Sequence, residues 1–254
     1  FLGTAVMAPT ALMASGGQYD DLLAEIAAGT HRVGIAFSEA IKRRNDAQVE
    51  ARDGALFGKS LFAFDADADS YLVADQKQHL YLVAADDPGL TRTHLTTVDK
   101  TRRTVELTYD NAAAQSVSTD VRVFESVLDI GRVAIAADTM GAAQNMLDQA
   151  VEYAKQREQF NRPIGSFQAV KHMCAEMAAQ LEPCRSMVWF AGHALAELPE
   201  EARVTACHTK AHLAEVAQFV AKTATEVHGG MGFTDLVGLH YWFRRCGANR
   251  QWLG

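Results

Sequence analysis

Residues 133–160 read VAIAADTMGAAQNMLDQAVEYAKQREQF, and the short turn NRPIGS at residues 161–166 leads to FQ at residues 167–168, which opens another helix. Apolar or small residues recur every three or four positions, at Val133, Ala137, Met140, Ala143, Leu147, Ala150 and Ala154. This spacing places a continuous apolar stripe along about seven helical turns. We therefore expect a long helix with one face buried in a helical bundle.

The end of this helix is strongly polar. Lys155, Arg157 and Gln159 crowd its last turn, and Pro163 and Gly165 stop it a few residues later. Cations at a helix C-terminus offset the helix dipole, so a purely structural role is as good an interpretation as a binding site from these residues alone.

Composition restricts the class of protein. With 48% hydrophobic and 22% charged residues, the sequence indicates a globular chain. A net charge of −7 argues against a nucleic-acid partner, because a polyanion needs a basic surface. No apolar run reaches the roughly 18 residues that a membrane span needs. We therefore expect a protein that neither binds nucleic acid nor spans a membrane.

Four cysteines lie in helical segments without metal-binding or paired spacing. The four are Cys174, Cys184, Cys207 and Cys246. They indicate reduced thiols and hence a cytoplasmic location. The chain starts at Phe1 in the middle of a helical pattern, so we expect a missing N-terminal part that would also hide any transit peptide.

The hydrophobic period changes twice along the chain. Residues 19–28 have helical spacing, and we expect Gly29 to cap this helix, whereas from about residue 30 to 128 short β-branched or aromatic runs alternate with Asp, Asn, Gly and Pro. These runs are RVGIAFSE, GALFGKSLFAF, SYLVADQ, LYLVAA, TRTHLTTV, TVELTYD and SVSTDVRVF. They predict an antiparallel β barrel or sandwich. Residues 129–254 return to helical spacing and predict a bundle of four helices, with Pro183 as a kink.

Two blocks resemble one known family. YAKQREQFNRPIGSFQAVKHMCAEM at residues 153–177 and EVHGGMGFTDLVGLHYWFRR at residues 226–245 are similar, in order and spacing, to two signature blocks of the acyl-CoA dehydrogenases. The resemblance covers residues 130–254 well and residues 1–129 weakly. It implies an α+β fold in which residues 1–29 end an N-terminal helical domain, residues 30–128 form the β domain and residues 129–254 form the helical bundle.

The family removes an α proton from an acyl-CoA thioester with a glutamate and passes a β hydride to FAD. The two positions that carry this glutamate in different subfamilies correspond here to Leu253 and Gly131, so the resemblance implies that the catalytic base is missing. A nearby carboxylate could replace it, and the candidates are Asp129, Asp138 and Asp235. Asp129 is the best placed, although an Asp just before a helix is more often a cap.

The part of the family's β domain that holds the flavin ring has also diverged. Ser38 and Glu39 match the Ser-Glu pair that precedes the family's glycine-rich turn, but residues 40–45 contain none of its glycines. Phe62, Ala63 and Phe64 stand where the family has Trp-Ile-Thr. A phenylalanine cannot supply the threonine hydroxyl, although two inward-facing residues of an ordinary strand would look the same.

The residues that would hold the adenosine diphosphate half of FAD are retained. In the family this half is bound by the neighbouring subunit, and the matching residues here are Arg157, Phe160, Gln168, Gly229 and Gly230, with Gly232 in the same turn and Glu226 where a glutamine is frequent. Arginine suits a diphosphate because its planar fork donates two parallel hydrogen bonds. No metal-ligand pattern appears, and GGMGF at residues 229–233 is no dinucleotide fingerprint because it does not follow a strand.

The chain thus lacks the family's base and ring-binding residues but retains those for the adenosine diphosphate half of FAD. This combination suggests the non-catalytic subunit of a heteromeric FAD-dependent enzyme. The resemblance implies a catalytic partner subunit in a heterotetramer, an acyl-CoA substrate such as a bulky sterol side-chain thioester, and an acceptor like an electron-transfer flavoprotein. Two alternatives remain: an active homotetramer that uses Asp129 as a displaced base, and a helical scaffold or thioester-binding protein without redox chemistry.

Overall fold

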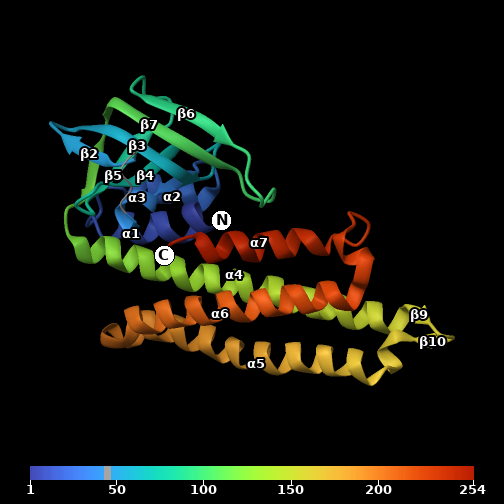
Figure 1. Ribbon diagram of the computed structural model, residues 1–254. Coiled ribbons are helices and arrows are strands. Elements are labelled where there is room, and N and C mark those ends of the chain that lie inside the picture. Colours follow the sequence, from blue (N-terminus) through green and yellow to red (C-terminus); the bar gives the residue numbers. More distant parts are fainter. Residues whose placement is uncertain (43–46) are drawn as a thin grey trace. The chain divides into compact units, whose positions relative to one another are not determined.

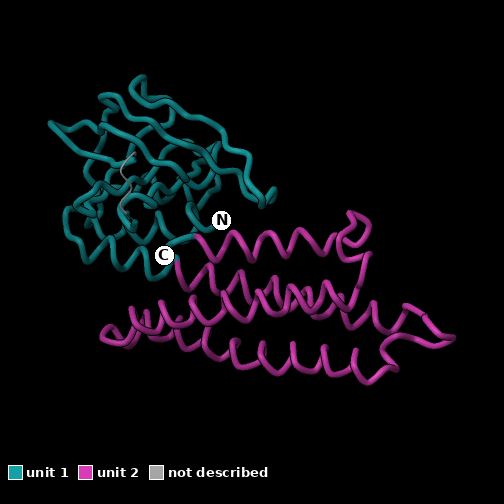
Figure 2. Tube along the Cα trace, in the orientation of Figure 1, with its two compact units in different colours: residues 1–131, 252–254 teal, residues 132–251 magenta. Residues whose placement is uncertain are grey.

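The computed structural model describes residues 1–42 and 47–254, and this part of the chain forms two compact units (Figure 2). Unit 1 comprises residues 1–131 and 252–254, and unit 2 comprises residues 132–251. Arg43, Arg44 and Asn45, which belong to the diverged turn considered above, lie outside the described residues.

Three short helical segments open unit 1. They are η1 (Leu2–Met7), α1 (Ala8–Met13) and α2 (Asp20–Ala28). Pro9 lies in the first turn of α1, where its missing N–H is not needed, and the helix type changes just before it. Gly29 ends α2 in the left-handed conformation at φ 74°. The expected capping by glycine is confirmed.

The rest of unit 1 is built on a β-sheet (Figure 1). Its strands are β1 (Val33–Ala36), β2 (Val49–Arg52), β3 (Ala55–Phe64), β4 (Ser70–Ala74), β5 (Leu80–Ala84), β6 (Leu90–Leu95), β7 (Thr104–Ala113) and β8 (Gln115–Ser118). The order is β6-β7-β3-β1-β4-β5-β8, and β2 pairs with β3 outside this path. The described pairs are antiparallel except β1 with β4, which run parallel, so the fully antiparallel prediction was wrong at this pair.

A tyrosine hydroxyl is buried in the core of this sheet. Alternate residues of β3 and β7 point inward, and among them Ser60 and Tyr109 share a hydrogen bond of 3.2 Å. Burial raises the pKa of Tyr109 far above its ordinary value. The hydroxyl therefore stays protonated, and its partner Ser60 removes the penalty of burying it.

Three segments differ from the expected strands. Strand β2 was not expected, because VEAR carries too few apolar residues to indicate a strand without its partner β3. Ser38 and Glu39 lie in the short helix α3 (Ser38–Ile41) instead of at a strand end. VRVF at residues 121–124 opens a helix, since Asp120 caps it by accepting a hydrogen bond of 2.9 Å from the Arg122 N–H. Helix therefore replaces strand before residue 129.

Unit 2 is a bundle of long helices. They are α4 (Val121–Gln156), of which residues 132–156 belong to this unit, α5 (Gln168–Glu197), α6 (Pro199–His228) and α7 (Leu239–Gln251). Between them lie β9 (Glu158–Gln159), β10 (Arg162–Pro163), η2 (Ile164–Ser166) and η3 (Gly229–Phe233). Helix α5 continues through Pro183. The predicted helical bundle is confirmed.

The bundle core is rich in small side chains. Its buried members include Ala142, Ala143, Met146, Leu147, Ala150, Ala154, Met177, Leu181, Leu213, Ala217, Val220, Ala221 and Ala224. All four cysteines are free thiols, as expected. Among the described residues, no helix is long and apolar enough to cross a membrane.

A polar network interrupts this apolar core. Asp138 of α4 accepts hydrogen bonds from Arg245 of α7, the shortest of them 2.6 Å, and another of 2.8 Å from Asn249. Asn249 also donates to the Thr139 hydroxyl at 2.9 Å. The Asp138 and Arg245 side chains are only 29% and 23% exposed, so little water competes with their ion pair.

We expect Arg245→Ala to lower the free energy of unfolding by about 2 kcal/mol, because it leaves the Asp138 carboxylate half-buried without its cation. The matched control is Arg185→Ala in α5, whose pair with Glu182 is 4.0 Å long and well exposed. That control should change stability by less than about 0.5 kcal/mol. Urea unfolding followed by circular dichroism measures both, and equal effects would contradict the structural role of the network.

Candidate functional site

A two-residue hairpin follows the end of α4. Strand β9 pairs with β10 in the register Arg162 opposite Gln159, and the Ile164 N–H donates a hydrogen bond of 2.8 Å to the Arg157 carbonyl. Phe160 and Asn161 form the turn, with φ angles of 53° and 60°. Such turns favour Asn-Gly, because residues other than Gly and Asn adopt this conformation at a free-energy cost of about 1–2 kcal/mol each.

Phe160 is therefore both strained and exposed. Its side chain is 87% accessible, and its ring meets Phe167 edge-on at 6.0 Å between centroids. A bulky residue with positive φ is unusual and points to a function. Arg157, at the base of the hairpin, is exposed as well, and among the described residues no carboxylate lies within ion-pair distance of its guanidinium.

The next helix begins beside this hairpin. Helix α5 starts at Gln168, and neither a side-chain cap nor an acidic residue in its first turn satisfies the free N–H groups. Gln168 forms a hydrogen bond of 2.9 Å with His172 one turn later. Unpaired N–H groups at a helix N-terminus favour an anion.

The end of α6 carries the remaining residues. Gly229 terminates the helix at φ 59° and ψ −140°, a conformation that residues with a Cβ atom rarely adopt. A Cβ atom added to Gly229 or Gly230 would meet no atom within 4 Å. These glycines thus leave open space, into which an external ligand can approach the backbone. Glu226, one turn earlier, is exposed.

One aromatic contact joins these elements. Tyr153 in the last turn of α4 stacks on the buried ring of His228 at the end of α6, 4.5 Å between centroids. The Nδ1–H of His228 donates to the Ala224 carbonyl at 2.7 Å, which fixes that ring. The end of α4, the start of α5 and the end of α6 accordingly lie at one end of the bundle (Figure 1). The structure therefore brings Arg157, Phe160, Gln168, Glu226, Gly229 and Gly230 to the same region of unit 2.

Ser38 lies in the other unit. Its hydroxyl donates to the Glu39 carboxylate at 2.8 Å, and the other oxygen of Glu39 accepts from the Leu61 N–H at 2.9 Å. Glu39 is only 4% exposed. The Ser38 hydroxyl thus helps to hold a buried carboxylate between α3 and β3.

The two positions matched to the family's base are neighbours in unit 1. A Cβ atom at Gly131 would lie 2.8 Å from Leu253 Cδ1 and 2.9 Å from Met7 Sδ. Leu253 is 5% exposed and Met7 is fully buried. Apolar atoms therefore fill the space that a side chain at residue 131 would need.

An aromatic cluster in unit 1 occupies the strand matched to the family's flavin-facing Trp-Ile-Thr. Trp252 packs against Phe64 with ring centroids 4.1 Å apart, and against Phe62 edge-on at 6.4 Å. Ala63 between them points to the core and is fully buried. Trp252 of the same unit thus covers Phe64, which is 8% exposed, whereas Phe62 stays 37% exposed.

The three carboxylates considered as replacement bases have different surroundings. Asp138 is engaged by Arg245 and Asn249. Asp235 is exposed and lies 3.2 Å from His240. Asp129 is buried in α4, at 5% exposure. Only Asp129 combines burial with a place close to Gly131 in the chain.

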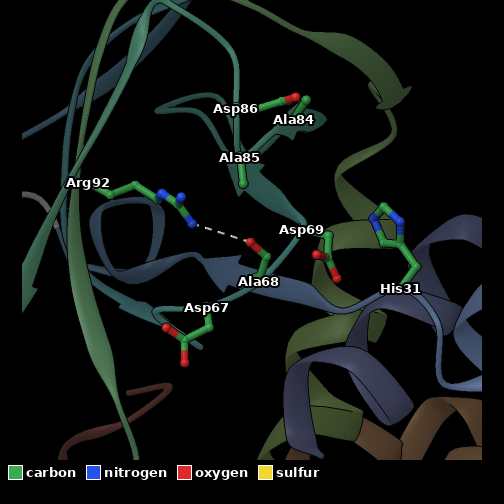
Figure 3. A pocket seen from close by; sticks show the side chains of 8 residues that line it. All are labelled: His31, Asp67, Ala68, Asp69, Ala84, Ala85, Asp86 and Arg92. Atoms are coloured by element: carbon green, nitrogen blue, oxygen red, sulfur yellow. Dashed lines mark hydrogen bonds between the residues drawn. The ribbon is translucent and has the colours of Figure 1, made fainter.

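Unit 1 also has an open hollow of about 590 Å³ (Figure 3). His31 and Arg92 lie on opposite sides of it, and three aspartates, Asp67, Asp69 and Asp86, line it between them. Arg92 donates to the Ala68 carbonyl at 3.4 Å, and the His31 Nε2 shares a hydrogen bond of 2.9 Å with Ser70. Asp67 also pairs with Arg103, and His31 lies 3.4 Å from Glu25; among the described residues no group of His, Cys, Asp or Glu could hold a metal ion.

Sequence reasoning did not single out Lys210, a buried lysine. Lys210 of α6 is 6% exposed, and burial lowers its pKa to about 8. Its Nζ donates to the Arg250 carbonyl at 3.4 Å. Helical spacing places Lys210 beside Leu213 and Ala206 on the buried face, so this pattern could have revealed it.

Comparisons with known proteins identify the family of the chain. The family described as "Acyl-CoA dehydrogenase, C-terminal domain" matches residues 121–254. Acyl-CoA dehydrogenase IpdE2 of Mycobacterium tuberculosis is 31% identical over 232 residues, which are 89% of this chain and 67% of that protein. Two further relatives, 34% and 40% identical, are covered over only 31% and 28% of their length.

Two solved structures are similar over nearly the whole chain. The ChsE4-ChsE5 complex from Mycobacterium tuberculosis has a TM-score of 0.86 and 25% identity, and the match covers 100% of this chain and 71% of that one. The Tcur3481-Tcur3483 steroid ACAD G363A variant has a TM-score of 0.86 and 26% identity, with coverages of 98% and 70%. The expected α+β fold is confirmed.

We expect Gly131→Ala to lower the free energy of unfolding by about 1 kcal/mol. Its new methyl group must displace Leu253 or Met7, and overpacking of about 1–3 kcal/mol exceeds the gain of about 0.5–1 kcal/mol in helix propensity. Gly141→Ala is the matched control, because the same helix leaves open space there, and it should stabilise by about 0.5–1 kcal/mol. Urea unfolding compares the two; stabilisation by both variants would show that residue 131 is not tightly packed.

Proposed function

Because the chain belongs to the acyl-CoA dehydrogenase family, we propose that it is the non-catalytic subunit of a heteromeric FAD-dependent acyl-CoA dehydrogenase. In this proposal it completes the FAD site of a catalytic partner subunit. The observation that carries the proposal is the contact of Gly131 with Leu253 and Met7, which leaves apolar atoms where the family keeps its base. The residues for the adenosine diphosphate half of FAD, in contrast, stay exposed at one end of the bundle.

The end of the bundle fits the diphosphate and adenosine part of FAD. The open space at Gly229 and Gly230 admits a planar group close to the backbone, and the uncapped start of α5 faces that end with free N–H groups. Arg157 supplies hydrogen bonds to a phosphate, and the exposed ring of Phe160 supplies a surface for adenine. When bound, FAD supplies the acceptor for the hydride that leaves the β carbon of the acyl chain.

Unit 1 argues against a second flavin ring in this chain. Trp252 already packs on Phe64, at the strand position matched to the family's ring contact. Ser38 donates its hydroxyl to Glu39 inside the protein instead of offering it to a ligand. Neither Leu253 nor Gly131 can take the α proton of a thioester, because neither side chain has a basic atom.

The substrate and partners follow by analogy. The neighbours include a complex of two named proteins and a steroid ACAD, so we propose a heterotetramer that acts on a bulky thioester such as a sterol side-chain CoA ester. An acceptor resembling an electron-transfer flavoprotein and a cytoplasmic location complete the proposal.

The rival function is an active homotetramer with Asp129 as a displaced base. The observation in its favour is the burial of this carboxylate at 5% exposure, two residues before Gly131.

We expect the purified chain alone not to reduce a dye acceptor with acyl-CoA, because a missing general base lowers the rate by on the order of 10² to 10⁴. The assay compares the chain alone with the chain co-expressed with the product of its neighbouring gene, and flavin absorbance is recorded for both. Turnover by the chain alone that disappears in Asp129→Asn would establish the rival function. Flavin absent from both samples would favour a scaffold without redox chemistry.

We expect Arg157→Ala to lower the flavin content of the partnered complex about tenfold or more. The guanidinium would donate a hydrogen bond to a charged phosphate, which contributes about 1.5–3 kcal/mol, and each 1.4 kcal/mol is a factor of ten. Arg185→Ala, another exposed arginine of unit 2, serves as the control and should keep full flavin. An Arg157→Ala complex with one tightly bound flavin per catalytic subunit would refute the site.

A further inference from the structure

A second arginine lies beside the candidate site, and no motif in the sequence singled it out. The guanidinium carbon of Arg162 is 3.9 Å from the centroid of the Phe167 ring. Phe167 also meets Phe160 edge-on. Phe160 in the hairpin and Phe167 in the turn after it thus form an aromatic pair, and Arg162 stacks on Phe167.

Stacking on Phe167 affects the arginine in two ways. The ring covers one face of the guanidinium, while the five N–H donors point outward in the plane of the group. The stack also restricts the long side chain, so less rotamer entropy is lost when these donors bind a ligand. Arg162 is therefore a cation prepared for planar, bidentate hydrogen bonding.

The donors of Arg162 are not used inside the chain. Among the described residues, no carboxylate or carbonyl accepts a hydrogen bond from its side chain, and Arg157 is in the same situation. Several exposed arginines elsewhere are paired, among them Arg122, which lies 2.6 Å from Asp120, and Arg52, which pairs with Glu50. Two arginines without anions at one hairpin indicate a ligand with more than one negative charge.

The geometry points to Arg162 as a second phosphate-binding residue, which with Arg157 binds the two phosphates of a dinucleotide's diphosphate. The inference rests on the proposed function, since it assigns a new residue to the same site. A diphosphate presents two adjacent charged groups, and each arginine can serve one of them with parallel hydrogen bonds. Phe167 acts as a positioning residue, because it reaches the phosphate only through Arg162.

The test uses the complex of this chain with its catalytic partner, from which flavin is removed before FAD is added back. Quenching of flavin fluorescence gives the Kd of FAD, and ADP serves as a competing probe. We expect Arg162→Ala to raise the Kd for FAD and the inhibition constant of ADP about tenfold. Arg162→Lys keeps the charge but not the planar fork and should give a smaller increase, as should Phe167→Leu, which removes the support.

Two further measurements separate binding from a structural effect. Arg162→Ala should flatten the dependence of the Kd on salt, because one cation fewer meets the phosphates. Its melting temperature should equal that of Arg185→Ala, which is the matched control in α5 and should bind FAD normally. An unaltered salt dependence together with a lower melting temperature would overturn the assignment in favour of a structural role.

The outcomes distinguish this inference from the proposed function. If Arg157→Ala weakens FAD binding but Arg162→Ala does not, the proposed function stands and the second phosphate residue is wrong. If the unmodified complex binds FAD but ADP does not compete, the site holds no diphosphate, and the inference fails. If the complex binds no FAD at all, both fail together.

Discussion

The close packing of α4 in unit 2 is the constraint from which the site follows. Alanines on its buried face belong to the same hydrophobic core as alanines of α6. At the end of this contact Tyr153 stacks on His228. Gly165 then returns against α4, since a Cβ atom there would lie 2.9 Å from the Ala154 carbonyl oxygen. The hairpin is thus held against the bundle by this close approach of Gly165 to the α4 backbone and not only by its own two strand pairs.

In unit 1, apolar side chains fill the positions matched to the family's base and ring contact. Leu253 and Met7 fill the place beside Gly131, and Trp252 covers Phe64. Each is a well-packed apolar contact of the kind that stabilises a core, and each lies at a position where the resemblance to the family implies a polar group. Under the proposed function, a leucine at the position of the base also avoids a buried carboxylate, which is costly to desolvate.

Much of the fold was predictable from the sequence. The switch of hydrophobic period located the sheet and the bundle, because burial on one face repeats every 2 residues in a strand and about every 3.6 in a helix. The rule failed where the apolar run was short. Val121 and Phe124 look like strand residues until the cap at Asp120 is considered, and β2 depends on its partner β3. Tertiary pairing decided β2, and local sequence does not contain it, whereas the cap at Asp120 is a local signal.

The candidate site shows the same limit. The matched blocks predicted which residues gather at the end of the bundle, but not that Phe160 adopts φ 53° or that Arg162 stacks on Phe167. Both depend on the hairpin's register, which places Arg162 opposite Gln159. A Gly at position 160 would relieve the backbone strain, so the phenylalanine is unfavourable for the turn by itself. The strained turn nevertheless exposes the Phe160 ring and places it against Phe167, on which Arg162 stacks. Aromatic faces and unpaired donors are thereby presented to solvent, which is what a binding site requires.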